Sequence, residues 1–577
     1  MKVTLIDFDE LDLEQGSGAV APAPESDQQP YGSTRAIANG VTAPMADGSV
    51  KKLRGGYYTP KPIADFLAAW GIVSPTASVL EPSAGDGALV AAAAERLDER
   101  GSITAIEIEV QEALKAQVKG GARALVFIGD FFEWFLESRA DGTFDTVIAN
   151  PPFIRYQSFP ERYRRAAFRL MQEEGLHPSR LTNAWVPFVV GATRALRPGG
   201  RLALVLPAEL LQVTYAAELR GYLARRYSEL TVVTFRRLTF AGIQQETILL
   251  LGVRRESTAA KMSFMELTDS ADLDFSSVTA AERVEVDLDH AREKWTQYYL
   301  TTRELGLVRE LECADIFGRL GDVAEIDVGI VTGRNEFFVM TKSEADSRGL
   351  TPWCVPLIGR SAQISGLALR QADWVGLSEA GTKSLLLNVG DLPMERLPRA
   401  VQNYIRNGEL AGFHEGYKCA IRLPHWWKIP SAWIPDAFLL RQIHDAPRIV
   451  ANDTDATCTD TIHRVRLKQG IDKHWLASVS INSLTLAFSE VRGRSYGGGV
   501  LELEPTEAEG LPFPKPGRYS PPLAELDACM RSHGTVPVLE VVDGHILRGA
   551  GLSTADIASL RTIWEKLRQR RAARRKG

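Results

Sequence analysis

Long hydrophobic runs are missing from this sequence. Although 45% of its 577 residues are hydrophobic, no apolar stretch reaches the roughly 18 residues that a membrane-spanning helix needs. The N-terminus is also too acidic for a signal or transit peptide, because five of the first fourteen residues are Asp or Glu. We therefore expect a cytoplasmic protein.

Cysteine is scarce as well. The five cysteines are far apart, form no CxxC pair, and have no histidine beside them at the spacing of a metal site. They are Cys313, Cys354, Cys419, Cys458 and Cys529. The sequence therefore indicates neither a disulfide framework nor a zinc site, and we expect no metal.

A strong overall charge is absent, but the charge is unevenly distributed. The formal net charge is −5, and the first fifty residues alone contain eight acids and two bases. Arginines alternate with aromatic residues from Arg155 to Arg169, and the stretch from Arg561 to Lys576 has eight bases and one acid. Each basic cluster is either a solvated helix face or a contact surface for a polyanion.

The length predicts two or three domains. Residues 1–50 have the composition of a disordered acidic tail, apart from one short strand expected at Val3–Ile6. Across 51–255, short β-branched runs alternate with helical patterns, which is typical of an α/β fold with a doubly wound parallel sheet. We expect a linker or peripheral segment at 256–300, and a mixed α/β domain at 301–577 that ends in a basic helix.

The α/β region contains seven expected strands and three expected helices. The strands are Ser78–Leu80, Ser102–Ile106, Ala124–Ile128, Thr143–Ala149, Arg201–Leu206, Glu229–Phe235 and Thr247–Val253, and the helices are Asp65–Trp70, Ala88–Leu97 and Trp185–Leu196. The "RPGG" at 197–200 predicts a stop between the last helix and the strand after it. Thr59 is expected to cap the first helix, with Pro60 at its first position.

A strand, a glycine turn and a helix follow one another in "SVLEPSAGDGALVAAAAERL". Gly85 and Gly87 allow a ligand to approach the backbone closely. Glu81 at the strand end distinguishes the turn from a dinucleotide site, whose GxGxxG seats a pyrophosphate on the helix N-terminus. An acid at this place suits a ligand that carries positive charge.

The next two strands also end in candidate ligand-binding residues. Glu107 is placed to bind ribose hydroxyls, Asp130 to accept a hydrogen bond from an exocyclic amine, and Phe131 to stack on a purine. Taken singly, they are a surface acid, a helix N-cap and a core residue. Taken together, they predict a pocket for adenosine with a cationic tail, and S-adenosylmethionine is the expected cofactor. Thr59, just before the first of these strands, is a further candidate for contact with its methionine end.

The fourth strand ends in Asn150-Pro151-Pro152-Phe153. An aromatic amine is a poor nucleophile because its lone pair is delocalised into the ring. The side-chain oxygen of Asn150 and the carbonyl of Pro151 are placed to accept hydrogen bonds from such an amine, and Phe153 offers a face for a flat base. Positive charge grows on the nitrogen as it attacks a sulfonium methyl group, so fixed carbonyl dipoles stabilise the transition state more than the ground state.

"YYTP", "EPSAGDG", "IEIE", "GDFF" and "NPPF", in this order, resemble the γ class of amino-methylating DNA methyltransferases, the N6-adenine enzymes of restriction–modification systems. The resemblance implies a class I S-adenosylmethionine-dependent catalytic domain at 51–255 and a target recognition domain at 301–577. "LGDVAEIDVGIVTGRNEFFV" and "SYGGGVLELEP" are similar to parts of that recognition domain. The implied reaction is methylation of N6 of an adenine flipped out of duplex DNA. Phe240 then either closes over the flipped base or lies in the core.

The resemblance also implies a setting. The partner is double-stranded DNA, and we expect a bacterial, nucleoid-associated protein that protects host DNA. A restriction endonuclease or another component of a phage-defence system would be encoded separately, because we find no nuclease motif in this chain. Alternatives are methylation of another planar amine, in a protein glutamine or an RNA guanine, and a DNA-binding specificity subunit without activity. About 320 residues after the catalytic domain favour recognition of a DNA sequence.

Several polar and charged residues in loop-like surroundings are candidates for DNA contact. In the catalytic domain they are Arg155, Arg164 and Arg165, and in the recognition domain they are Arg334, Asn335, Arg360, Arg492 and Arg494.

Overall fold

The structure is a computed structural model of the chain. It describes residues 4–5, 58–237, 246–255, 261–275, 289–290, 293–429, 431–496, 499–517 and 521–573. These residues form two compact units, each with its own internal contacts. The first unit takes its residues from 1–207, 215–235 and 247–285, and the second from 208–214, 236–246 and 286–577.

A nine-stranded sheet forms the centre of the first unit, in the order β1-β4-β3-β2-β5-β6-β8-β7-β9. The strands are β1 (Thr4–Leu5), β2 (Ser78–Glu81), β3 (Ser102–Glu107), β4 (Ala124–Ile128), β5 (Phe144–Ala149), β6 (Leu196–Pro207), β7 (Tyr227–Phe235), β8 (Thr247–Arg254) and β9 (Lys261–Leu267). From β4 to β6 all neighbours are parallel, whereas β8 is antiparallel to both β6 and β7. This arrangement confirms the predicted doubly wound α/β fold.

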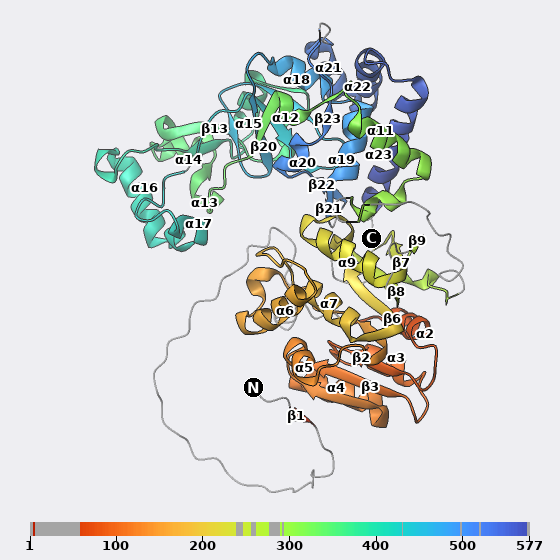
Figure 1. Cartoon of the computed structure of the whole chain (residues 1–577). Coiled ribbons are helices and arrows are strands. Elements are labelled where there is room, and N and C mark those ends of the chain that lie inside the picture. Colours follow the sequence, from red (N-terminus) through yellow and green to blue (C-terminus); the bar gives the residue numbers. More distant parts are fainter. Residues whose placement is uncertain are drawn as a thin grey trace, which may run out of the picture. The chain divides into compact units, whose positions relative to one another are not determined.

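Helices pack beside this sheet, and Figure 1 shows α3, α4 and α5 next to β2 and β3. The helices are α2 (Lys61–Gly71), α3 (Ala88–Ala94), α4 (Val110–Gly120), α5 (Phe131–Ser138), α6 (Glu161–Glu173), α7 (Trp185–Ala195) and α9 (Ala217–Arg226). Because Leu202–Leu206 of β6 and Ile248–Leu251 of β8 are apolar and buried, these parts of the two strands form the centre of the core, as expected for strands covered on both faces. The carboxyl ends of β2 to β5 meet at one edge of the sheet, where open α/β folds bind ligands.

Two local predictions differ from the structure. The "RPGG" segment does not separate α7 from the next strand, because β6 already begins at Leu196 and the register shifts between Phe144 and Thr146 instead. The segment expected to be a linker or peripheral segment contains a strand that was not predicted, β9, which pairs in parallel with β7 at the edge of the sheet. A short edge strand gives only a weak sequence signal, since it has one neighbour and a mixed pattern of burial.

The second unit has the mixed α/β character expected of residues 301–577. A five-stranded sheet runs β11-β20-β16-β18-β14 and a four-stranded sheet runs β12-β15-β13-β19. Their strands are β11 (Ala324–Val328), β12 (Val339–Met340), β13 (Cys354–Ile358), β14 (Ala368–Arg370), β15 (Leu385–Leu387), β16 (Ala437–Leu440), β18 (Ile449–Asp453), β19 (Thr457–Cys458) and β20 (Ile462–Leu467). The longer helices are α11 (Thr302–Cys313), α15 (Gln371–Glu379), α16 (Arg399–Leu410), α18 (Lys473–Val479), α19 (Ser483–Arg492), α21 (Leu523–His533), α22 (Thr535–Val542) and α23 (Thr554–Ala573).

A lobe within the second unit has its own core, which buries residues between Ile330 and Trp427. Figure 1 shows the lobe in teal and green, with α13 (Asn335–Phe338), α14 (Lys342–Ser347), α16 and α17 (Tyr417–Ala420) at one side of this unit. Its aromatic rings pack closely: the centroid of Phe337 lies 4.7 Å from those of both Tyr404 and Trp426.

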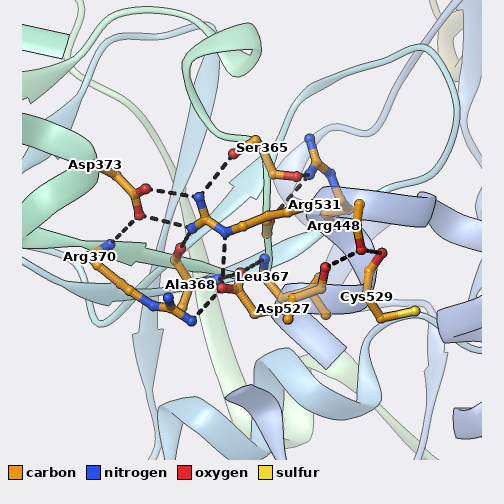
Figure 2. A network of polar contacts seen from close by, with 12 residues as sticks. Ser365, Leu367, Ala368, Arg370, Asp373, Arg448, Asp527, Cys529 and Arg531 are labelled. Carbon is orange, nitrogen blue, oxygen red and sulfur yellow. Dashed lines mark hydrogen bonds and ion pairs between the residues drawn. The ribbon is translucent and has the colours of Figure 1, made fainter. Parts of the chain in front are cut away.

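A buried carboxylate joins α21 to the five-stranded sheet, as Figure 2 shows. Asp527 is fully buried and accepts hydrogen bonds from the backbone N–H of Leu367 at 2.7 Å and of Ala368 at 3.1 Å. Arg370 and Arg531 donate to its other oxygen at 2.6 Å and 2.9 Å. The network therefore connects α21 to β14.

The basic C-terminal helix, α23, packs into the second unit. Arg571 is 2% exposed and donates to the buried carboxylate of Glu490 at 2.7 Å, and also to the carbonyls of His444 at 2.9 Å and Gly499 at 2.7 Å. Lys566 pairs with Glu304 at 3.0 Å. The described part of this cluster is therefore neither a solvated face nor a free polyanion surface.

Within the described residues, no helix combines the length and apolar character needed to cross a membrane.

Candidate active site

Four candidate residues lie at the carboxyl ends of four adjacent strands. Glu81 ends β2, Glu107 ends β3, Asp130 follows β4 and Asn150 follows β5. Because these strands are neighbours in the order β4-β3-β2-β5, the sheet brings the four residues to one edge. Among the described residues, no group of three His, Cys, Asp or Glu side chains is arranged to hold a metal ion.

Glu81 is an unusual carboxyl group because it is fully buried. Its Oε1 atom accepts a hydrogen bond from the backbone N–H of Ser83 at 3.1 Å, while Oε2 is buried and has no hydrogen-bond partner. Burial raises the pKa of Glu81 to about 8. An unpaired carboxyl oxygen in such a place would be satisfied by a cationic ligand group, which would also favour its ionised form.

Glu107 is tied to the glycine turn. Its Oε2 accepts from the N–H of Gly85 at 2.7 Å and its Oε1 from the N–H of Glu109 at 2.9 Å. Gly85 has φ +53°, and a Cβ there would meet nothing within 4 Å, so the turn has open space at this point. Gly87 has φ +80°, and a Cβ there would lie 2.5 Å from the Cα of Ala116. Gly87 therefore allows α3 to start against α4, whereas Gly85 leaves room at the predicted ligand site.

Asp130 is the N-cap of α5. Its Oδ1 accepts hydrogen bonds from the N–H groups of Phe132 at 2.9 Å and Glu133 at 3.0 Å, and it is 7% exposed. Burial raises its pKa to about 7. Asp130 therefore caps α5, which is one of the two roles considered from the sequence. A contact with a cofactor would be a second role for the same carboxyl group.

Phe131 does not occupy the position expected for a stacking residue. It is 2% exposed, and its ring stacks on that of Phe188 with 5.4 Å between centroids. Phe131 is a core residue because α7 packs over it, and this cannot be seen in the "GDFF" motif alone. Ile108, which the sequence reasoning missed, is 42% exposed directly after Glu107 and offers an apolar surface at the same sheet edge. The sequence feature that could have identified Ile108 is its place between two acids, Glu107 and Glu109, at the end of a strand.

Asn150 and Thr59 are in direct contact. The Asn150 Nδ2 group donates to Thr59 Oγ1 at 3.2 Å, which assigns the NH₂ end of the amide to Thr59 and the carbonyl end to the opposite side. Thr59 is 8% exposed and is not a helix cap, because α2 begins at Lys61 with Pro60 as its N-cap. The predicted capping role of Thr59 is therefore wrong, and the residue positions Asn150. In the rest of the motif, Pro151 is buried, and Pro152 and Phe153 are half-buried.

Asn183 was not identified from the sequence, yet it holds the segment that follows the Asn-Pro-Pro-Phe motif. Its Oδ1 accepts from the N–H of Tyr156 at 3.2 Å, and its Nδ2 donates to the hydroxyl of Tyr215 at 2.9 Å. The next residue, Ala184, donates its N–H to the carbonyl of Ile154 at 2.9 Å. An isolated Asn before a helix is a common N-cap pattern, so nothing in the sequence distinguished it.

The candidate DNA-contact residues of the first unit lie on or before α6. Arg155 is exposed. The guanidinium of Arg164 lies 4.5 Å from the centroid of the Tyr156 ring, and Arg165 forms a surface pair with Glu161 at 2.7 Å. Phe240, the other candidate for base stacking, lies outside the described residues.

In the second unit, the candidates separate into two groups. Arg360 and Asn335 are exposed, and Arg334 is half-buried at the N-terminus of α13. In contrast, Arg492 pairs with Glu312 and donates to the carbonyl of Gly510, and Arg494 donates to Glu507 at 3.1 Å. The last two arginines were expected to contact DNA, but in the structure they connect parts of the unit itself.

Comparison with known proteins identifies relatives of the chain. Residues 95–240 match the family "Eco57I restriction-modification methylase", and residues 292–547 match "Type II methyltransferase M.Eco57I, C-terminal domain". The Type II methyltransferase M.AccI of Acinetobacter calcoaceticus is 19% identical over 468 residues, which cover 78% of this chain and 83% of that protein.

Two further matches are of other kinds: one covers a short part of the chain, and the other is a distant solved structure. The tRNA1(Val) (adenine(37)-N6)-methyltransferase of Haemophilus influenzae (strain PittEE) is 28% identical over 145 residues, covering 24% of this chain and 58% of that protein. The solved structure of the type IIG restriction endonuclease BpuSI covers 91% of this chain and 67% of its own, with 12% identity and a TM-score of 0.38. Over most of its length, this chain is related to Type II restriction–modification methyltransferases, which confirms the resemblance predicted from its motifs.

Proposed function

We propose that this protein transfers a methyl group from S-adenosylmethionine to N6 of an adenine that is flipped out of duplex DNA. The observation that carries the proposal is the placement of Asn150, whose amide is oriented by Thr59 beside three strand ends that bear acids. The setting would be a restriction–modification or related phage-defence system, with any nuclease encoded separately.

The residues at the sheet edge fit the cofactor. S-adenosylmethionine carries an ammonium and a sulfonium group, and the unpaired, buried oxygen of Glu81 provides a site for positive charge. Glu107 lies beside the open turn at Gly85 and is assigned to the ribose hydroxyls, and Asp130 to the adenine amine. When bound, the cofactor supplies an electrophilic methyl group. Ile108, rather than Phe131, is the apolar surface available next to these residues.

Asn150 and Pro151 would act on the target amine. The side-chain oxygen of Asn150 and the backbone carbonyl of Pro151 accept hydrogen bonds from the two N–H bonds of the adenine amine, which favours a tetrahedral nitrogen with its lone pair directed at the methyl group. Thr59 accepts a hydrogen bond from the NH₂ end of the amide, so we assign the oxygen end to the substrate. The interaction between these fixed dipoles and the nitrogen becomes stronger as positive charge develops on the nitrogen, so it lowers the barrier.

The second unit is assigned to target recognition. The family match at 292–547 and the size of this unit support the assignment. The alternative is another planar amine, in RNA or in a protein. The match to a tRNA adenine-N6 methyltransferase spans only 24% of this chain. An RNA substrate would therefore give no reason for the second unit.

The test is methyl transfer by the purified full-length protein from labelled S-adenosylmethionine to duplex DNA, tRNA and protein, followed by nucleoside analysis. We expect N6-methyladenine in DNA only. In the Asn150→Ala variant, turnover should fall by about 10²-fold or more, while calorimetry should find cofactor affinity little changed. Label found only in methylcytosine, RNA or protein would contradict the proposal.

A further inference from the structure

The lobe of the second unit presents large apolar side chains to solvent around α17. Tyr417 is 76% exposed and Ile421 is 63% exposed, and their spacing places them on the same face of one helical turn. Leu410 and Leu423, on either side of this turn in the sequence, are also exposed. A group of exposed apolar side chains in one short segment marks an interaction site.

The backbone beneath these side chains is held firmly. Arg422 donates to the carbonyls of Lys418 at 2.8 Å and Lys428 at 2.9 Å, and also to that of Thr332. A methyl group added at Gly416 would lie 2.8 Å from Arg334 Nε, so the start of α17 lies directly against the Arg334 side chain. The turn that contains Arg334 and α17 therefore form one preorganised surface, which reduces the entropic cost of binding.

The charge around this surface selects the kind of partner. Among the charged residues of 399–428, three bases are exposed, Arg399, Arg406 and Lys418, against one exposed acid, Glu415. Lys418 is exposed, and its Nζ lies 5.8 Å from the centroid of the Tyr417 ring. A cation beside an exposed aromatic ring complements a polyanion that also offers flat apolar surfaces, and nucleic acid has both.

We infer that the surface formed by Tyr417, Lys418 and Ile421 contacts the duplex DNA substrate; the inference rests on the proposed function. Lys418 lies next to a backbone phosphate, and Tyr417 with Ile421 packs against bases or sugars. Apolar side chains of this kind support a deformed duplex when a base step is opened, which an enzyme that flips its target base requires.

The experiment measures duplex binding by the full-length protein at several salt concentrations, with two variants. Tyr417→Ser combined with Ile421→Ser should weaken binding about ten-fold without changing the slope of log Kd against log salt, because stacking and apolar contacts release no counterions. Lys418→Glu should weaken binding and lower the magnitude of that slope by about one. These side chains are exposed, so thermal melting should stay unchanged.

Matched controls are Val73→Ser and Lys468→Glu. Val73 is 69% exposed and precedes β2, at the sheet edge opposite Asn150, and Lys468 is an exposed residue in a turn after β20. Neither control should change DNA binding. If the wild-type protein methylates DNA but the Tyr417 and Ile421 variant binds DNA as the controls do, the inference fails while the proposed function stands. Sedimentation showing that the variant instead disrupts a dimer would assign the surface to a second copy, whereas a wild-type protein that neither binds nor methylates DNA would refute the proposed function.

Discussion

At the scale of single residues, the sequence predicts which side chains form the site, but it does not predict their burial or protonation. The acids Glu81, Glu107 and Asp130 follow from their places at strand ends. Their burial depends on how the whole chain packs, so the raised pKa values of Glu81, to about 8, and Asp130, to about 7, appear only in the structure. Phe131 shows the reverse case, because burial removes the role that its type suggested.

The pKa of Glu81 leads to a prediction about stability and pH. The folded protein without ligand retains a proton on Glu81 up to about pH 8, whereas the ordinary value is 4.5. Between these values the folded state binds more protons than the unfolded state, so this group lowers the stability as pH rises through the window. Between pH 5 and pH 8, the melting temperature of the Glu81→Gln variant should therefore fall less than that of the wild type.

Bound cofactor should change this comparison. A cationic ligand stabilises the ionised carboxylate, so S-adenosylmethionine should stabilise the wild type more at pH 8 than it stabilises Glu81→Gln. Glu95→Gln is a suitable control, because Glu95 is an exposed carboxylate at the end of α3. Parallel pH curves for wild type and Glu81→Gln would show that Glu81 is not the titrating group.

At the scale of elements, most strands of the first sheet were predictable, and one edge strand was not. The seven expected strands of the α/β region are present, because strands covered on both faces are rich in apolar runs, and β1 (Thr4–Leu5) lies within the short strand expected at Val3–Ile6. The edge strand β9 has one neighbour and was not predicted, and "RPGG" joins a strand instead of preceding it. Helix α23 was recognised as basic, but its partners, such as Glu490 and Glu304, lie far away in the sequence.

The loop after the catalytic motif provides a prediction at this scale. Asn183 connects Tyr156 to Tyr215, so Asn183→Ala removes a link on each side of the loop. We expect a fall in kcat of about ten-fold or more, because a small misplacement of the reacting groups is costly. Cofactor affinity should remain unchanged, since the two links join Tyr156 and Tyr215, which lie outside the ends of β2, β3 and β4.

Two variants distinguish positioning from general stability. Asn183→Asp keeps an acceptor for the Tyr156 N–H and should recover part of the activity, whereas Tyr215→Phe removes only the second link and should have an intermediate effect. Single-turnover kinetics with saturating DNA give the relevant rate. A loss of activity that follows melting temperature across the three variants, with KM and kcat changed together, would indicate a structural role alone.

At the scale of the whole molecule, the division into two units follows the sequence only approximately. The predicted border near residue 255 does not account for residues 208–214, which have their contacts within the second unit. For example, Gln212 Nε2 donates to the carbonyl of Ser495 at 2.6 Å. Such interleaving gives no compositional signal, because a few residues that leave one core and return resemble an ordinary loop.

This interleaving determines how the division of labour must be tested. A chain cut after Val253 would remove β9 from its partner β7 and would leave 208–214 without the second unit. Substitutions in the full-length protein avoid both problems. Arg155 and Arg165 are exposed in the first unit, after the catalytic motif, and Arg360 is exposed in the second. Arg165 has only a surface ion pair, which contributes little to stability.

We therefore predict different effects from the two units. Arg155→Glu combined with Arg165→Glu should weaken binding to all duplexes equally and lower the magnitude of the salt slope by about one for each phosphate that the protein no longer neutralises, because backbone contacts carry no sequence information. Arg360→Ala should instead reduce the ratio of specific to nonspecific affinity, by about ten-fold if it contacts a base edge. The recognition site is first identified by locating the modified bases in methylated DNA. The measurement then compares binding to a duplex that contains this site with binding to a scrambled duplex, at several salt concentrations. If the double variant alters the affinity ratio while Arg360→Ala preserves it, sequence recognition belongs to the first unit.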